Sequence, residues 1–172
     1  MKDNQIVTFN AFDLLQVAMI AERIHCVKRT LNVNSVKCDL SQTEFELDYI
    51  GAMGEYAISK YFSSPINYEI HPGGDNGIDI CINGFACQIK TAARNYKKSY
   101  LYFNDMDCFC APVAIYAKVI SPIKVELVGC ISRKTFIENH IVKDFGYGER
   151  LAMPEGELTD LSVLLNERTA SP

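Results

Sequence analysis

The stretch GIDICINGFACQIKT, residues 77–91, decides the fold of this chain of 172 residues. Its centre, Asn83-Gly84, is the dipeptide that most strongly favours a two-residue turn between antiparallel strands. Apolar residues alternate with other residues on both sides of this turn, as they do in strands with one buried face. We therefore predict a hairpin with strands at about 78–82 and 85–91.

The turn also fixes which side chains share a face, because side chains alternate along each strand. One face is entirely apolar and is predicted to be core: it holds Ile78, Ile80, Ile82, Phe85, Cys87 and Ile89. On the other face Asp79 is expected opposite Gln88, with Lys90 one step beyond. A carboxylate, an amide oxygen and an ammonium group therefore converge, beside the small residues Cys81 and Ala86.

This polar patch allows two interpretations. A solvated sheet face often carries an Asp and a Lys on a diagonal, and such a face has no chemical role. A binding site is the alternative, because the small neighbours leave a hollow. The preceding glycine-rich loop, residues 73–77, would also let the backbone approach a ligand closely.

The remaining chain reads as helices followed by strands. Apolar residues recur at three- and four-residue steps in two N-terminal segments, which predicts helices at about 11–31 and 43–62. Ser41 or Thr43 is the expected N-cap of the second helix, and Pro65 is expected to end it. Further strands are expected at 67–71, 100–103, 113–120 and 124–131, and short helices at 132–139 and near 158–166. This order predicts one α+β or mixed α/β domain, with N-terminal helices at 11–62, a core sheet at about 67–131 and a C-terminal extension at 132–172.

Composition narrows the class of protein. Hydrophobic residues make up 48% and charged residues 22%, which excludes a disordered chain or a fibre, and the net charge of −4 excludes a basic coat for nucleic acid. The seven cysteines are odd in number and include no Cys-x-x-Cys, so we expect free thiols in a reducing cytoplasm and no structural zinc. No apolar run approaches the ~20 residues of a membrane span, and no membrane partner is expected.

Three short motifs together carry a family resemblance. They are Gly51-Ala52-Met53-Gly54-Glu55 on the second helix, Gly77-Ile78-Asp79 on the first hairpin strand and Gln88-Ile89-Lys90 on the second. Their order and spacing resemble the PD-(D/E)XK nuclease superfamily over roughly residues 43–131. The resemblance implies a restriction-endonuclease-like core, in which a central mixed β-sheet is flanked by helices. Gln88 departs from the more usual Glu or Asp, and the Gln-x-Lys variant occurs among active members.

The resemblance also implies a site. Asp79, the side-chain oxygen of Gln88 and the backbone carbonyl of Ile89 would hold Mg²⁺ or Mn²⁺, because oxygen ligands suit these hard cations. Lys90 would orient or deprotonate the attacking water and stabilise negative charge. Glu55 is the candidate second carboxylate on the metal, and an exposed helix residue is the alternative. Gly51 and Gly54 would let its helix lie close to the sheet.

Two flanking segments contain candidate substrate contacts. Arg94, Tyr96, Lys97 and Lys98 resemble a phosphate-contacting segment with an aromatic ring for stacking, and a solvated basic loop is the alternative. In the loop before the hairpin, His71 and Asp75 are candidates for a contact with substrate or metal.

The expected function is therefore a Mg²⁺- or Mn²⁺-dependent deoxyribonuclease, an endonuclease of the kind found in phages or mobile elements. A nuclease-fold module that binds nucleic acid or protein, with metal affinity weakened by Gln88, is the alternative. The expected partner is DNA, whether duplex, branched or single-stranded, and a homodimer would bring two cuts into register. The net charge does not oppose this, because the segment 90–98 is locally +4 while the acidic residues cluster elsewhere.

Overall fold

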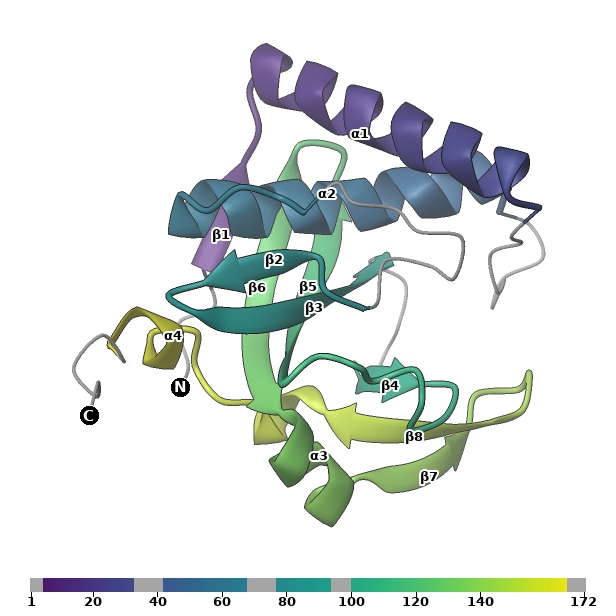
Figure 1. The fold of residues 1–172 in the computed structure, drawn as a ribbon, viewed down its shortest axis with the longest axis vertical. Coiled ribbons are helices and arrows are strands. Elements are labelled where there is room, and N and C mark those ends of the chain that lie inside the picture. Colours follow the sequence, from purple (N-terminus) through teal and green to yellow (C-terminus); the bar gives the residue numbers. More distant parts are fainter. Residues whose placement is uncertain (1–4, 33–41, 68–76, 94–99, 167–172) are drawn as a thin grey trace.

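A five-stranded mixed sheet forms the centre of the molecule (Figure 1). The computed structural model describes residues 5–32, 42–67, 77–93 and 100–166. The strand order is β1-β6-β5-β3-β2, in which β3 and β5 run parallel and the other neighbours antiparallel. Its strands are β1 (Gln5–Thr8), β2 (Ile80–Ile82), β3 (Phe85–Ala93), β5 (Val113–Ser121) and β6 (Lys124–Ser132). Helices and a second sheet surround it, so the mixed α/β class is confirmed.

The β2–β3 hairpin has the predicted turn and register. Asn83 and Gly84 both have positive φ, 48° and 91°, as a two-residue hairpin turn of this kind requires. The ladder pairs Ile82 with Phe85 and Ile80 with Cys87. Regular pairing ends there, and the Asp79 backbone N–H donates to the Cys87 carbonyl at 2.9 Å.

Helix α2 (Glu44–Phe62) packs on one face of this sheet, and the long helix α1 (Ala11–Thr30) lies against the outer side of α2 (Figure 1). Each begins with a capping box, in which the N-cap side chain and the third helical residue exchange hydrogen bonds with each other's backbone. The N-cap of α2 is Thr43, one of the two expected residues. The helix ends at Phe62, before the left-handed Ser63 and three residues ahead of Pro65.

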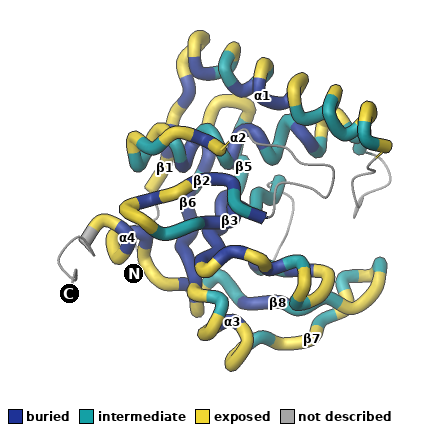
Figure 2. Tube along the Cα trace, in the orientation of Figure 1, coloured by how far each residue is buried: buried dark blue, intermediate teal, exposed yellow. Residues whose placement is uncertain are grey.

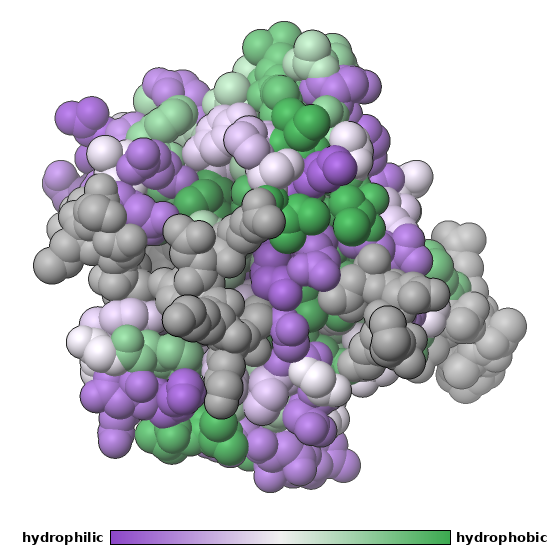
Figure 3. All heavy atoms as spheres, turned by 180° about the vertical axis from the view of Figure 1, so that it is seen from behind, coloured by the Kyte–Doolittle hydropathy of each residue, from purple (hydrophilic) through white to green (hydrophobic). Residues whose placement is uncertain are grey.

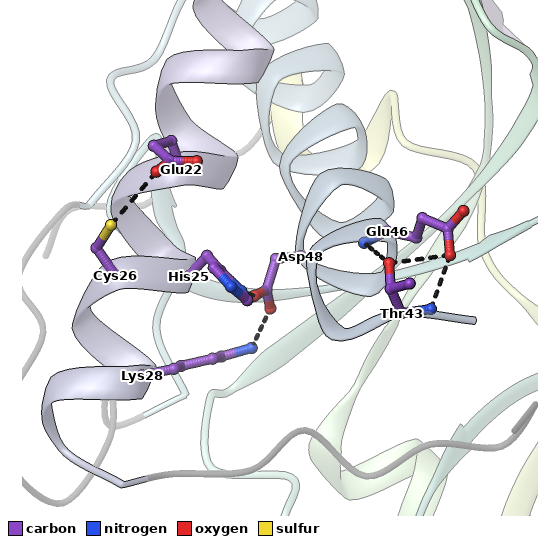
Figure 4. A network of polar contacts seen from close by, with 7 residues as sticks. All are labelled: Glu22, His25, Cys26, Lys28, Thr43, Glu46 and Asp48. Carbon is purple, nitrogen blue, oxygen red and sulfur yellow. Dashed lines mark hydrogen bonds and ion pairs between the residues drawn. The ribbon is translucent and has the colours of Figure 1, made fainter. Parts of the chain in front are cut away.

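Buried carboxylates join the two helices. Asp48 on α2 accepts hydrogen bonds from Lys28 at 2.5 Å and contacts His25 Nδ1 at 3.0 Å, as Figure 4 shows beside the Thr43 cap. At the other end of the two helices, Asp13 on α1 forms an ion pair with Lys60 at 2.6 Å and accepts a hydrogen bond from the Tyr56 hydroxyl at 2.9 Å. Both pairs fix the register of α1 on α2, because an unpaired carboxylate would be costly at these buried positions.

A second, three-stranded sheet packs against the other face of the first. Its strand order is β4-β8-β7, with β4 at Tyr100–Phe103, β8 at Glu149–Pro154 and β7 at Ile141–Asp144. Helix α3 (Arg133–Asn139) lies beside it, and a 3-10 turn (Glu155–Glu157) and α4 (Val163–Asn166) follow (Figure 1). The strand at 100–103 and the helix at 132–139 were expected, whereas β1, β7 and β8 were not. The predicted last helix is also shorter, since only 163–166 are helical.

The buried residues form two hydrophobic clusters, one on each face of the central sheet. Figure 2 shows that the central strands of this sheet are largely buried. The first cluster holds α1, α2 and the predicted apolar face of the hairpin, of which Ile80, Ile82, Cys87 and Ile89 are buried. The second holds Leu101, Phe103, Phe109, Tyr116, Phe136 and Met153. β3 lies between the clusters, so alternate side chains along it enter different environments.

Phe12, Leu15 and Met19 form an exposed apolar stripe on α1. Figure 3, seen from behind, shows hydrophobic atoms gathered at the end of the molecule where α1 lies. None of the helices in the described part of the chain is both long and apolar enough to cross a membrane.

Candidate functional site

Asp79 lies at the mouth of the β2–β3 hairpin and turns its carboxylate onto β3. The Ile89 backbone N–H donates to Asp79 Oδ2 at 2.5 Å, and Asp79 as a whole is only 9% exposed. The side chain therefore reaches the peptide unit that joins Gln88 to Lys90. This places the carboxylate beside the Gln-x-Lys motif, although the predicted pairing of Asp79 with Gln88 is absent, because the regular ladder ends at Ile80 and Cys87.

Gln88, the residue before Ile89, presents a buried side-chain oxygen. Its Nε2 donates to the Cys108 carbonyl at 3.1 Å, which fixes the amide orientation because that carbonyl can only accept. Its Oε1 is then buried with no hydrogen-bond partner among the described residues. Such an oxygen is costly in a native protein and is a position where an ion or a ligand atom would be favourable.

Lys90 follows on the same face of β3. Its Nζ lies 5.3 Å from the centre of the Phe103 ring, and its neighbour across the parallel pair β3–β5 is Tyr116. No carboxylate within the described ranges makes an ion pair with this ammonium group. Lys90 thus keeps its positive charge available beside Gln88.

The ammonium group lines a groove of about 310 Å³ between β3, β4 and β5, which we call the Lys90 groove. Its wall includes Ala92, Tyr100, Tyr102, Asn104, Cys108 and Tyr116. Aromatic rings thus form much of the described lining, and Lys90 is the cation among the described lining residues. Sequence reasoning missed these wall residues, because most of them come from segments that only the tertiary fold brings next to β3.

Two glycines of the motifs have clear packing reasons. A Cβ at Gly77, which has φ of +67°, would lie 2.8 Å from Cys110 Cβ and 3.4 Å from Gln88 Nε2. On α2, a Cβ at Gly54 would lie 2.9 Å from Thr91 Cβ and closer still to its hydroxyl. Gly51 has open space around it, so the expectation that both helix glycines allow close packing is wrong for Gly51.

Glu55 lies on α2 next to Gly54 and is partly exposed. Since Gly54 meets Thr91, α2 packs on the face of β3 opposite to Gln88 and Lys90. Glu55 therefore approaches from the other side of the strand, and its role as a second carboxylate stays a prediction.

The described part of the chain holds no group of three or more His, Cys, Asp or Glu residues arranged to bind a metal. Among the described residues, the oxygen ligands placed at the Ile89 peptide are the Asp79 carboxylate and the neutral oxygens of Gln88 and Ile89. Six of the residues expected at the site lie outside the described residues: His71, Asp75, Arg94, Tyr96, Lys97 and Lys98.

Cysteine chemistry is disfavoured around this site. Burial raises the pKa of Cys87 to about 12, so its thiol stays protonated at neutral pH. Burial, with a hydrogen bond to Asp105, also raises the pKa of Cys108 beside the Lys90 groove. Neither group is poised as a thiolate nucleophile.

The chain was also compared with known proteins. No model of a protein family matches it, and no curated protein matches it.

Proposed function

We propose that this protein is a divalent-cation-dependent nuclease that hydrolyses phosphodiester bonds in DNA. The observation that carries the proposal is the convergence of three groups around the Ile89 peptide. They are the Asp79 carboxylate, the unpartnered Oε1 of Gln88 and the ammonium group of Lys90.

The oxygen atoms at this site fit a hard cation that takes only a few of its ligands from the protein. Mg²⁺ commonly uses one or two carboxylates and completes its octahedron with waters and substrate phosphates. Asp79 and Gln88 Oε1, with the Ile89 carbonyl, would hold it through oxygen atoms only. When bound, such an ion supplies an activated water and neutralises charge on the scissile phosphate.

The protein's own groups would do the remaining work. Lys90 would hold the attacking water by a hydrogen bond and would offset negative charge that develops on the phosphate. Its position over the Phe103 ring restricts the ammonium group to the groove side of β3. Thr91 and Gly54, on the opposite face, would support the strand that carries Lys90.

The arrangement of elements supports a restriction-endonuclease-like core. A helix is followed by an antiparallel hairpin with the motif residues, then by a connection and a strand parallel to β3. This is the order that the sequence resemblance implies. The three-stranded sheet that covers the second face would be an addition to that core.

The test is a cleavage assay on supercoiled plasmid, single strands and branched DNA with Mg²⁺ or Mn²⁺. We expect Asp79→Asn and Lys90→Gln to lower the cleavage rate by about 100-fold or more. Glu138→Gln and Lys124→Gln are matched controls at exposed positions and should cleave like the wild type. Metal-independent cleavage, or cleavage that survives both site substitutions, would refute the proposal.

A binding module is the second candidate, and the neutral Gln88 favours it. One carboxylate holds a divalent ion less strongly than two, so the site could bind nucleic acid without cutting it. DNA binding by the wild type, together with no cleavage of any substrate in either metal, would select this candidate.

A further inference from the structure

Aromatic rings from β4 and from the turn between β7 and β8 form a cluster, which we call the aromatic platform: Tyr100, Tyr102, Phe145 and Tyr147. Phe145 is its centre, with ring centroids 5.7 Å from Tyr100, 5.2 Å from Tyr102 and 6.1 Å from Tyr147. All four side chains are partly exposed, unlike the buried Phe103 on the inner face.

Two cations lie over these rings. Lys143 Nζ is 5.1 Å from the Tyr100 ring centre and 5.8 Å from that of Phe145. The Arg150 guanidinium is 5.6 Å from the Tyr147 ring centre. In the part of the chain that the structure describes, no carboxylate forms an ion pair with either cation.

The two cations are also direct neighbours across the β7–β8 pair. Like charges directly opposite each other destabilise an antiparallel pair, so this placement has a cost in the free protein. An anion between them would remove that cost. Aromatic faces beside paired cations are the combination that single-stranded nucleic acid requires, since bases stack on rings and phosphates bind cations.

The platform continues into the Lys90 groove. Tyr100 and Tyr102 belong to both, because they line the groove and also contact Phe145. β4 is one of the two edge strands of its sheet, and its residues line the groove. A single strand of nucleic acid bound on the platform would thus pass over β4 toward Lys90.

We propose that the aromatic platform binds an unpaired stretch of nucleic acid and delivers it to the Lys90 groove. This inference rests on the proposed function, and it narrows the proposed substrate to nucleic acid that contains a single-stranded segment. A duplex fits less well, because paired bases do not offer their faces to aromatic side chains.

The test measures binding without cleavage. Fluorescence anisotropy in EDTA would follow a fluorescein-labelled oligothymidylate of about 15 nucleotides and a duplex of equal length. We expect the single strand to bind about tenfold more tightly than the duplex. Tyr102→Leu should weaken single-strand binding about tenfold, and Tyr102→Phe should retain it, because the ring remains.

The salt dependence of the same binding tests the cations. Lys143→Gln and Arg150→Gln should each reduce the slope of log affinity against log salt by about 0.7, the value for one phosphate contact on a single strand. Lys124→Gln removes an exposed charge at the start of β6, in the other sheet, and should leave the slope unchanged. These surface substitutions keep the test decisive if Tyr102→Leu fails to fold.

Equal affinity for single strand and duplex, or wild-type binding by the platform variants, would overturn the inference. Binding to phosphatidylserine vesicles but not to the oligonucleotide would overturn it in favour of a membrane surface. Failure of the nuclease proposal is distinguishable, because binding in EDTA does not depend on cleavage. Asp79→Asn should abolish cleavage and still bind the single strand like the wild type.

Discussion

Gly51 and Gly54 form a matched pair on one helix, and replacing each with alanine should have opposite effects on stability. Both are interior positions of α2, where alanine is favoured over glycine by about 0.9 kcal/mol. Gly51 has nothing within 4 Å of a new Cβ, so Gly51→Ala should gain this full amount. At Gly54 the new Cβ would overlap the side chain of Thr91, which is β-branched and has few alternative rotamers.

Overpacking of this kind costs about 2 kcal/mol, so Gly54→Ala should be destabilised by about 1 kcal/mol after the gain in helix propensity. The two variants should therefore differ by about 2 kcal/mol in the free energy of unfolding, measured by urea titration. Adding Thr91→Ala to Gly54→Ala should recover part of the loss, because it removes the two outer atoms of the overlap. Thr91→Ala alone should cost little, since the Thr91 hydroxyl is buried without a partner among the described residues. Equal stability of the two glycine variants would refute the close contact of α2 with β3.

Two further predictions concern buried polar groups. Gln88→Glu adds a carboxylate, so Mn²⁺ should raise the thermal unfolding temperature of this variant more than that of the wild type. Without metal, the variant should be less stable than the wild type by about 2 kcal/mol, because the hydrogen bond to the Cys108 carbonyl is lost. An unchanged response to Mn²⁺ would argue against an ion at this position. For Asp13, burial alone would raise the pKa, but hydrogen bonds from Lys60, Asn10 and Tyr56 outweigh it and hold the pKa below 3.8. The stability that this lowered pKa provides is present above pH 3.8 and is lost as acid protonates the Asp13 carboxylate. The free energy of unfolding of the wild type should therefore exceed that of Asp13→Asn by about 1 kcal/mol at neutral pH, and the two values should converge in acid.

The helices and the hairpin could be predicted because their signals are local. The capping residue Thr43 and the three- and four-residue apolar spacing define α2 within its own sequence. The Asn83-Gly84 turn likewise fixes the register that brings Asp79 to the Ile89 peptide. A turn of two residues leaves no freedom to shift the strands, so the pairing of residues 80–82 with residues 85–87 followed from the sequence alone. The hydrogen bond of Asp79 to Ile89 lies beyond this regular ladder.

The second sheet could not be predicted, because its strands pair with distant segments. β8 is the central strand between β4 and β7, and its Leu151 lies opposite Phe103, far away in the chain. β1 has only Val7 buried, so it shows no alternating pattern. The bond between Gln88 and the Cys108 carbonyl depends on the same distant packing, and no local signal announces it.

The distribution of cations explains why an acidic chain is compatible with a nucleic-acid substrate. Lys28, Lys60 and Lys118 form ion pairs with carboxylates of the scaffold, so these charges are already neutralised. Lys90, Lys143 and Arg150 lie over aromatic rings instead and keep their charge for an incoming anion. Three such cations would give a single strand a salt slope of about −2 from the described residues, far shallower than that of a basic coat with many contacts. Affinity on this surface must then come mainly from stacking, and it should persist at salt concentrations that release proteins bound through charge alone.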